Sequence, residues 1–181
     1  MSAPQSVPAA GSVAAPVAIL IGPPGSGKTT VGALLAAELG VGFTDTDADV
    51  AAAAGKPVSD IFVEDGEPAF RELERAAVAQ ALGGSTGVVA VGGGAVLDPL
   101  TQAGLAGHTV VYLETGFAAA AKRVGLSHAR PLLIGNPRAT LKILLDQRIP
   151  VYQRLATITV GTDGREPADI AADIAARLAG S

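Results

Sequence analysis

The sequence of 181 residues contains no cysteine and no tryptophan, and its aromatic residues are limited to four phenylalanines and two tyrosines. The absence of cysteine excludes disulfides, thiolate catalysis and cysteine-ligated metals, and it is typical of a reducing compartment, so we expect a cytoplasmic protein. With few aromatic rings and a net charge of −4, the chain offers neither a stacking platform nor a broad basic surface for nucleic acid. A small-molecule partner is therefore expected.

Long hydrophobic runs are also missing, although 49% of the residues are hydrophobic. No stretch approaches the roughly 18 uninterrupted apolar residues typical of a transmembrane helix, so we expect no membrane partner. Residues 1–15 are rich in alanine, proline and serine and lack a basic start, which predicts a disordered N-terminal tail. Residues 16–181 are then expected to form one domain, long enough to bury a substantial core.

The stretch AILIGPPGSGKTT, residues 18–30, carries the strongest local signal. Its segment from Gly22 to Thr29 fits G-x-x-x-x-G-K-[ST], a phosphate-binding loop whose backbone N–H groups surround an anion. In a chain of this composition, the four fixed positions would coincide by chance with a probability of roughly one in a hundred. We expect Lys28 to reach the β- and γ-phosphates of ATP as a catalytic cation, and the Thr29 hydroxyl to ligate Mg²⁺. The nucleotide-binding residues assigned to this loop are Gly25, Ser26, Gly27, Lys28, Thr29 and Thr30.

Apolar, strand-like segments alternate along the chain with helix-compatible ones, which predicts an α/β fold with a parallel sheet flanked by helices. The strands are predicted at 17–21, 42–46, 87–91, 109–114 and 157–160, and the helices at 29–39, 68–82, 116–124, 138–154 and 167–179. Ligands of such sheets bind beyond the carboxyl ends of the strands. We therefore expect the phosphate loop, DTD at 45–47 and GGG at 92–94 to share one site.

Phosphate loops occur in many nucleotide-binding proteins, so the identity of the phosphoryl acceptor has to come from other motifs. Those motifs are DTD (45–47), IFVEDGEPAFRELE (61–74), GGG (92–94), RPLL (130–133) and RIPVYQRLA (148–156). In this order and spacing, nearly the whole chain after residue 16 resembles the shikimate kinases. The resemblance implies a P-loop, nucleotide-monophosphate-kinase-like fold, with a five-stranded parallel sheet in the order 2-3-1-4-5 and a small lid at about residues 122–138.

The same resemblance implies an ATP-dependent transferase of aromatic amino acid biosynthesis. Such an enzyme transfers the γ-phosphoryl of MgATP to the 3-hydroxyl of shikimate, giving shikimate 3-phosphate and ADP. The resemblance assigns Asp47 to the acceptor hydroxyls, as the catalytic carboxylate that orients or deprotonates the attacking one, and Asp45 to Mg²⁺ through water. Alternating strand residues share a face, so we expect both carboxylates on one side of the strand end. The alternative for such an aspartate is a cap on the next helix.

The resemblance also assigns Arg71 and Arg148 to the carboxylate of shikimate, with Glu74 bracing Arg71. Paired arginines and a carboxylate suit a ligand with one carboxylate and three hydroxyls. Without the resemblance, Arg71 and Glu74 would be interpreted as a surface ion pair at i,i+3, and Arg148 as a surface charge on a helix kinked by Pro150. The backbone expected to approach shikimate closely is that of Gly92, Gly93 and Gly94.

Three further residues are assigned by resemblance alone. Arg130 matches a lid arginine that meets the transferring phosphoryl group, so we assign it to catalysis and to nucleotide binding. Arg123 and Pro167 match positions that sandwich adenine. The chain departs from the family at Ala51, where a glutamate is common, so a contact near the acceptor pocket is absent or rebuilt.

Two other functions stay open at the level of sequence. Another small-metabolite kinase of the same fold, such as a gluconate kinase, would keep the loop and the lid without needing paired carboxylate-binding arginines. A non-catalytic nucleotide switch would carry a guanine-reading element such as N-K-x-D, which the sequence lacks. We expect a monomeric shikimate kinase that uses Mg²⁺, with ATP and shikimate as its partners.

Overall fold

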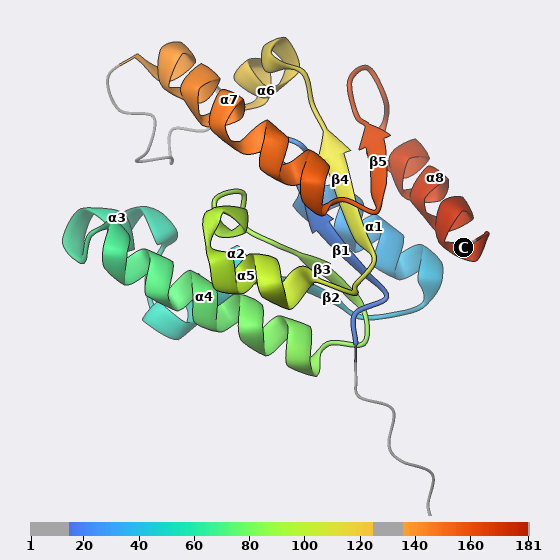
Figure 1. The fold of residues 1–181 in the computed structure, drawn as a ribbon, viewed down its shortest axis with the longest axis horizontal. Helices are drawn as coiled ribbons and strands as arrows, with labels where there is room; N and C mark the ends of the chain where they lie inside the picture. The colour runs from blue at the N-terminus through green and yellow to red at the C-terminus, as the bar shows by residue number, and fades with distance from the viewer. Residues whose placement is uncertain (1–14, 125–135, 181) are drawn as a thin grey trace, which may run out of the picture.

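In the computed structural model, residues 15–124 and 136–180 are described. Their strands form a five-stranded parallel sheet in the order β2-β3-β1-β4-β5, which confirms the predicted topology (Figure 1). The strands are β1 (Ala18–Ile21), β2 (Phe43–Asp45), β3 (Val88–Ala90), β4 (Val110–Glu114) and β5 (Ile158–Gly161).

Helices cover both faces of the sheet (Figure 1). They are α1 (Lys28–Leu39), α2 (Thr46–Ala54), α3 (Val58–Glu64), α4 (Glu67–Gly84), α5 (Pro99–Leu105), α6 (Phe117–Val124), α7 (Pro137–Leu155) and α8 (Pro167–Ala179), with a 3-10 turn η1 (Ala95–Leu97). Helices α1 and α8 pack on one face. Helices α4, α5 and α7 pack on the other, together with η1.

The central strand β1 is buried on both sides, as its continuous run of apolar residues predicts. Ala18 and Leu20 pack toward α1 and α8, whereas Ile19 and Ile21 pack toward α4, α5 and α7, and all four are 0% exposed. This alternation follows from the period of two in a strand. It anchors the strand end from which the phosphate loop departs.

Three helices, α2, α3 and α5, were not expected from the sequence, and the strands predicted at 17–21, 42–46, 87–91 and 109–114 are each shorter than predicted. The strand predicted at 42–46 ends at Asp45, because the Asp45 side chain accepts a hydrogen bond from Asp47 N–H and so caps α2. Asp47 therefore lies in the first turn of a helix and not on a strand. The argument that alternation places Asp45 and Asp47 on one side of a strand was wrong, and the capping alternative is confirmed for Asp45.

Two regions named in the sequence analysis lie wholly or largely outside the described residues. These are the predicted tail at 1–15 and the predicted lid at about 122–138, of which 125–135 are not described. Within the described ranges, no helix is long and apolar enough to cross a membrane.

Gly87, just before β3, is pressed against the backbone of the segment that leads into β2. A Cβ at this position would collide with the carbonyl group of Gly42, whose oxygen accepts the N–H of Val88. Gly83, in α4, has nothing within 4 Å of the same added atom. The two glycines are thus a matched pair for testing close backbone approach.

We expect Gly87→Ala to lower the free energy of unfolding by about 1–3 kcal/mol, because the two strands must move apart to admit the methyl group. Gly83→Ala should leave the stability unchanged or raise it by up to about 1 kcal/mol, since alanine is the better helix former. Urea unfolding of both variants is the measurement. Equal stability of the two would show that this strand contact is not close-packed.

Candidate active site

The phosphate loop connects β1 to α1 as the sequence predicts. Gly25 and Gly27 have φ angles of 78° and 91°, a left-handed conformation that glycine adopts without strain. Lys28 begins α1, and its Nζ donates to the carbonyl oxygens of Gly22 at 2.8 Å and Pro23 at 3.1 Å, so the cation lies across the loop. The N-cap residue of α1 is Gly27, which has no side chain to cap the helix, and the N-terminus of a helix is a favourable place for an anion.

A hydroxyl and a carboxylate meet beside this loop. The Thr29 hydroxyl donates to Oδ2 of Asp45 at 2.6 Å, while Oδ1 of Asp45 accepts from Asp47 N–H at 3.0 Å. One carboxylate thus holds together the start of α1 and the start of α2. Oxygen ligands of this kind, one or two from the protein with the remainder from phosphate and water, suit Mg²⁺.

These groups share a cavity of about 240 Å³ at the carboxyl ends of β1, β2 and β3. Its lining joins the phosphate loop to Asp45, Asp47 and Gly93. The predicted convergence of the phosphate loop, DTD and GGG on one site is therefore confirmed. Asp47 is exposed and lines this cavity.

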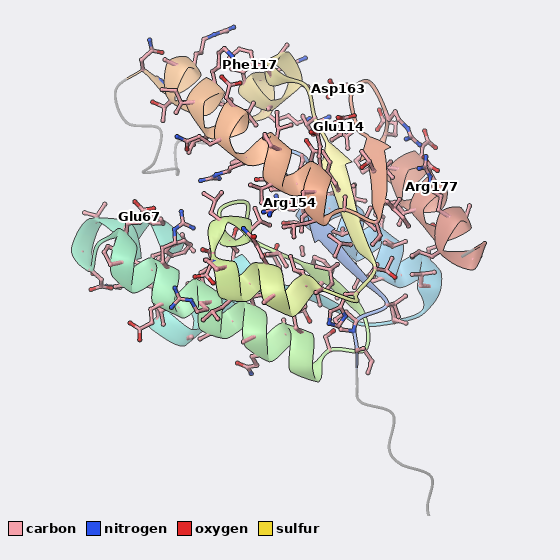
Figure 2. The ribbon with its side chains drawn as sticks, in the orientation of Figure 1. Glu67, Glu114, Phe117, Arg154, Asp163 and Arg177 are labelled. Carbon is pink, nitrogen blue, oxygen red and sulfur yellow. The ribbon has the colours of Figure 1, made fainter. Side chains whose placement is uncertain are left out.

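Arg71 and Glu74 form an ion pair on α4, with Nη1 and Oε2 2.6 Å apart. Glu67, one turn earlier at the start of α4 (Figure 2), contacts Nη2 of Arg71 at 3.2 Å. Glu74 is only 3% exposed, which overturns the interpretation of a surface pair. Desolvation by burial raises the pKa of Glu74, and this outweighs the opposing charge of Arg71.

The three glycines at 92–94 lie among these charged groups. A Cβ on Gly92 would stand 2.6 Å from Oδ1 of Asp47 and 2.7 Å from Oε1 of Glu74, and one on Gly94 would stand 2.5 Å from Nη1 of Arg71. Side chains at Gly92 and Gly94 would therefore collide with the charged groups of Asp47, Glu74 and Arg71.

Arg148 on α7 is 3% exposed, so the alternative of a surface charge is wrong. Its charge lowers the pKa of both Glu74 and Tyr152, although burial keeps each of them raised. Within the described part of the chain, the buried Nε of Arg148 has no hydrogen-bond partner. A buried guanidinium with an unused donor is suited to a carboxylate ligand.

The structure gives positions for four of the remaining predicted residues and none for Arg130. Ser26 is buried and Thr30 lines the loop cavity. Arg123 of α6 donates from Nη1 to the Gly25 carbonyl at 2.9 Å, which brings it to the phosphate loop. Pro167 is the first residue of α8. Arg130 lies outside the described residues.

Thr46 and Tyr152 belong to the site, although the sequence analysis did not select them. The buried hydroxyl of Thr46 accepts from Gly92 N–H at 3.1 Å, and the Tyr152 hydroxyl donates to the Gly93 carbonyl at 2.6 Å. Tyr152 follows Arg148 by four residues, so their shared helix face was a usable signal. Thr46 stands between two assigned aspartates, but only the tertiary contact reveals what its hydroxyl does.

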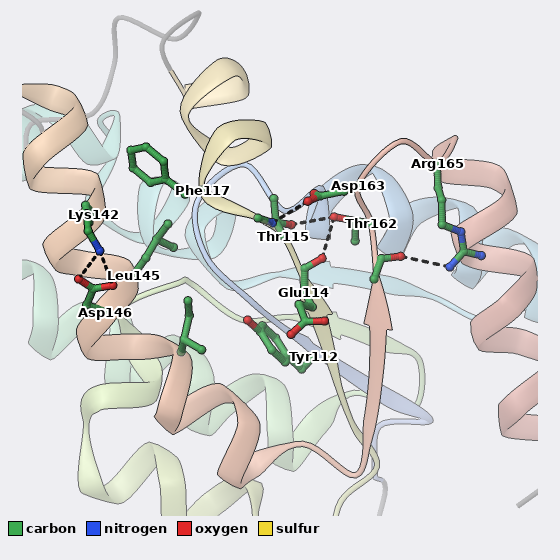
Figure 3. A pocket seen from close by; sticks show the side chains of 13 residues that line it. Tyr112, Glu114, Thr115, Phe117, Lys142, Leu145, Asp146, Thr162, Asp163 and Arg165 are labelled. Atoms are coloured by element: carbon green, nitrogen blue, oxygen red, sulfur yellow. Dashed lines mark hydrogen bonds and ion pairs between the residues drawn. The ribbon is translucent and has the colours of Figure 1, made fainter.

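A larger cavity, of about 630 Å³, lies near the carboxyl ends of β4 and β5 (Figure 3). None of its described lining residues was assigned to the site. Several of its polar groups satisfy one another: Lys142 pairs with Asp146 at 2.8 Å, and Asp163 accepts from Gly116 N–H at 2.9 Å (Figure 3). The convergent charges described above are found in the smaller cavity and its surroundings.

The chain is similar to known proteins in sequence and in overall structure. Residues 24–179 match the family model described as shikimate kinase. A shikimate kinase from Thermobifida fusca is 63% identical over 163 residues, which cover 90% of this chain and 95% of that protein. One from Salinispora arenicola is 62% identical over 165 residues, covering 91% and 99%. The structure of the Acinetobacter baumannii shikimate kinase in complex with shikimate superposes with a TM-score of 0.88 at 33% identity, covering 92% of this chain and 93% of that one.

The raised pKa of Glu74 makes a signed prediction about stability. Because the folded protein holds this proton more tightly than the unfolded chain, the contribution of Glu74 to stability is full below its ordinary pKa of 4.5 and is lost as the pH rises through the folded pKa. We therefore expect the free energy of unfolding of the wild type to fall relative to that of Glu74→Gln over this window. Urea unfolding of both proteins between about pH 4 and pH 8 measures the difference. If the wild type instead became more stable relative to Glu74→Gln as the pH rises, the charge of Arg71 would have a larger effect on the pKa of Glu74 than burial does.

Proposed function

This chain belongs to the shikimate kinase family, and from that premise we propose that it transfers the γ-phosphoryl of MgATP to the 3-hydroxyl of shikimate, giving shikimate 3-phosphate and ADP. The observation that carries the proposal is the buried Arg148, with an unused Nε donor, close enough to Glu74 to act on its pKa together with Arg71 and Asp47. Two guanidinium groups beside a carboxylate and a glycine backbone form a pocket for a small hydroxy acid next to a phosphate loop.

We assign the phosphate groups of ATP to the phosphate loop and the N-terminus of α1, with Lys28 neutralising charge on the β- and γ-phosphates. Arg123 and Pro167 are proposed to hold adenine between them, and the contact of Arg123 with Gly25 supports a position near the nucleotide. Arg130 is proposed, by family resemblance, to meet the transferring phosphoryl group from a lid at about 122–138.

Mg²⁺ is assigned to Thr29 and Asp45. Their hydroxyl and carboxylate lie 2.6 Å apart beside the loop, and hard oxygen donors of this kind fit Mg²⁺ that is shared with nucleotide phosphates. When bound, the ion would neutralise charge on the phosphates during transfer. Asp45 also caps α2, so its orientation is fixed by the fold before any ligand arrives.

Asp47 is proposed to accept hydrogen bonds from the ring hydroxyls and to take the proton of the attacking 3-hydroxyl. Arg71, Arg148 and Glu74 then orient the ring through its carboxylate, with Glu74 holding Arg71 in place. Transfer in this fold depends mainly on alignment and charge neutralisation, with little covalent chemistry for the protein. Rigid placement of the acceptor is therefore the main task of these residues.

The function is tested by ADP formation with MgATP over a panel of acceptors: shikimate, gluconate, other hydroxy acids and nucleoside monophosphates. We expect shikimate to be clearly the best acceptor, because it alone in the panel combines a carboxylate for two arginines with ring hydroxyls for Asp47. Equal or better turnover with gluconate or a nucleotide would overturn the assignment. Slow ATP hydrolysis that shikimate does not change would favour a nucleotide switch.

The role of Asp47 is tested by Asp47→Asn, which keeps the size of the side chain and removes its ability to accept a proton. We expect kcat to fall by about 10²-fold or more while the affinity for MgATP stays the same. Asp49→Asn is the matched control, because Asp49 is an exposed residue of the same helix outside the pocket lining. Activity of Asp47→Asn within a few-fold of the wild type would assign Asp47 a structural role only.

A further inference from the structure

The glycine segment 92–94 is held in place by two buried hydroxyls from distant parts of the sequence. Thr46, the first residue of α2, is 0% exposed, and its Oγ1 accepts from Gly92 N–H at 3.1 Å. Tyr152 of α7 is also 0% exposed, and its hydroxyl donates to the Gly93 carbonyl at 2.6 Å. Two neighbouring glycines thus have one backbone group each fixed by a different helix.

These attachments connect the groups that would receive the acceptor. Thr46 is adjacent in sequence to Asp47, and Tyr152 lies one helical turn beyond Arg148. The path from Thr46 through Gly92 and Gly93 to Tyr152 therefore sets the separation between the proposed proton acceptor and a proposed carboxylate-binding arginine. Without it, three successive glycines would have wide conformational freedom.

The surroundings of Tyr152 fix its ring and keep its hydroxyl protonated. The Tyr152 ring stacks on Tyr112, with ring centroids 5.2 Å apart and planes inclined by 23°, so its position is fixed by packing. Burial raises the pKa of Tyr152, which keeps the hydroxyl protonated as a donor. On the other side of the segment, a Cβ on Gly93 would stand 3.2 Å from the Gly22 carbonyl oxygen of the phosphate loop. The phosphate loop thus lies close to the same segment.

We infer that Thr46 and Tyr152 are positioning residues that act through the backbone of Gly92 and Gly93 to hold the acceptor pocket ready for shikimate. Their hydroxyls stabilise one arrangement of the glycine segment before the acceptor binds, so binding does not have to order it. The nucleotide site is held separately, by the phosphate loop and Lys28. The inference rests on the proposed function for the identity of the acceptor.

The test uses Thr46→Val and Tyr152→Phe, which preserve most of the side-chain volume. Thr46→Val removes the acceptor of Gly92 N–H, and Tyr152→Phe removes the donor to the Gly93 carbonyl together with the hydrogen bond between the Tyr152 hydroxyl and Arg148. We expect Thr46→Val to raise KM and Kd for shikimate by roughly 3- to 10-fold, the range for loss of one neutral hydrogen bond, and Tyr152→Phe to raise them at least as much, with KM for ATP changed less than about 2-fold. In the double variant, the rise in Kd for shikimate should be smaller than the product of the two single rises, because the loss of either hydrogen bond already frees the glycine segment. Thr46→Ser, which restores the acceptor oxygen, should recover most of the affinity.

Two control variants show whether an effect on shikimate binding comes from the glycine segment or from the removal of any buried hydroxyl. Thr101→Val removes a buried hydroxyl that has no hydrogen-bond partner in the described part of the chain, and Tyr112→Phe removes the hydroxyl of the ring stacked on Tyr152. Both should leave KM for shikimate unchanged. Hydrogen exchange of the peptide spanning 88–97, measured without ligands, should be faster in Thr46→Val and Tyr152→Phe but not in the controls.

Several outcomes would overturn the inference. Equal rises in the constants for shikimate and ATP, the same rise in the control variants, or failure of Thr46→Ser to recover affinity would each assign Thr46 and Tyr152 a purely structural role. If Thr46→Val does not fold, Tyr152→Phe and Thr46→Ser still decide between the two roles. A wild type that does not phosphorylate shikimate would instead overturn the proposed function, while the exchange experiment would still test the attachment of the glycine segment.

Discussion

The site depends on a short piece of backbone that carries no side chains. Around Gly92, Gly93 and Gly94, the space that a Cβ would fill is already occupied by carboxylate oxygens, a guanidinium group and the backbone of the phosphate loop. Three separate parts of the sequence, the phosphate loop, α2 and α4, therefore meet at one glycine segment. Because backbone N–H and C=O groups are fixed by the fold, this segment also offers hydrogen bonds whose direction does not rely on side-chain rotamers.

Charged groups of both signs lie close together around this segment. Arg71 is paired with Glu74 and Glu67, while Arg148 is buried and retains an unused donor. Asp47 and Glu74 approach the same glycine, and the charge of Asp47 contributes to the raised pKa of Glu74. An acceptor that brings its own carboxylate to Arg148 and Arg71 would complete this arrangement. A buried cation without such a ligand is expensive, which explains why an anionic acceptor suits the pocket.

The parallel sheet brings the parts of the site to one edge. In the strand order, β3 lies on one side of β1 and β4 on the other (Figure 1). The carboxyl end of β1 is therefore a switch point, where the connections after neighbouring strands lead to opposite sides of the sheet. The phosphate loop follows β1, Asp45 ends β2, and the glycine segment follows β3. Ligands of open α/β sheets bind at such a switch point, because the loops there diverge and leave a crevice.

The sequence by itself determined the phosphate loop, the parallel α/β fold and the set of charged residues, because each rests on local spacing or on a combination of motifs. It predicted the burial of β1 for the same reason, since a strand covered on both faces needs a continuous apolar run. It did not determine that α2 begins at Thr46, because the capping bond from Asp47 N–H to Asp45 competes with strand extension and the outcome depends on the tertiary contact with Thr29. Only the tertiary structure decided that Glu74 and Arg148 are buried, and that Thr46 and Tyr152 reach the same glycine segment. The hydrogen bond from Tyr152 to Gly93 joins residues 59 positions apart, and the one from Arg123 to Gly25 joins residues 98 positions apart. No local pattern specifies such pairs.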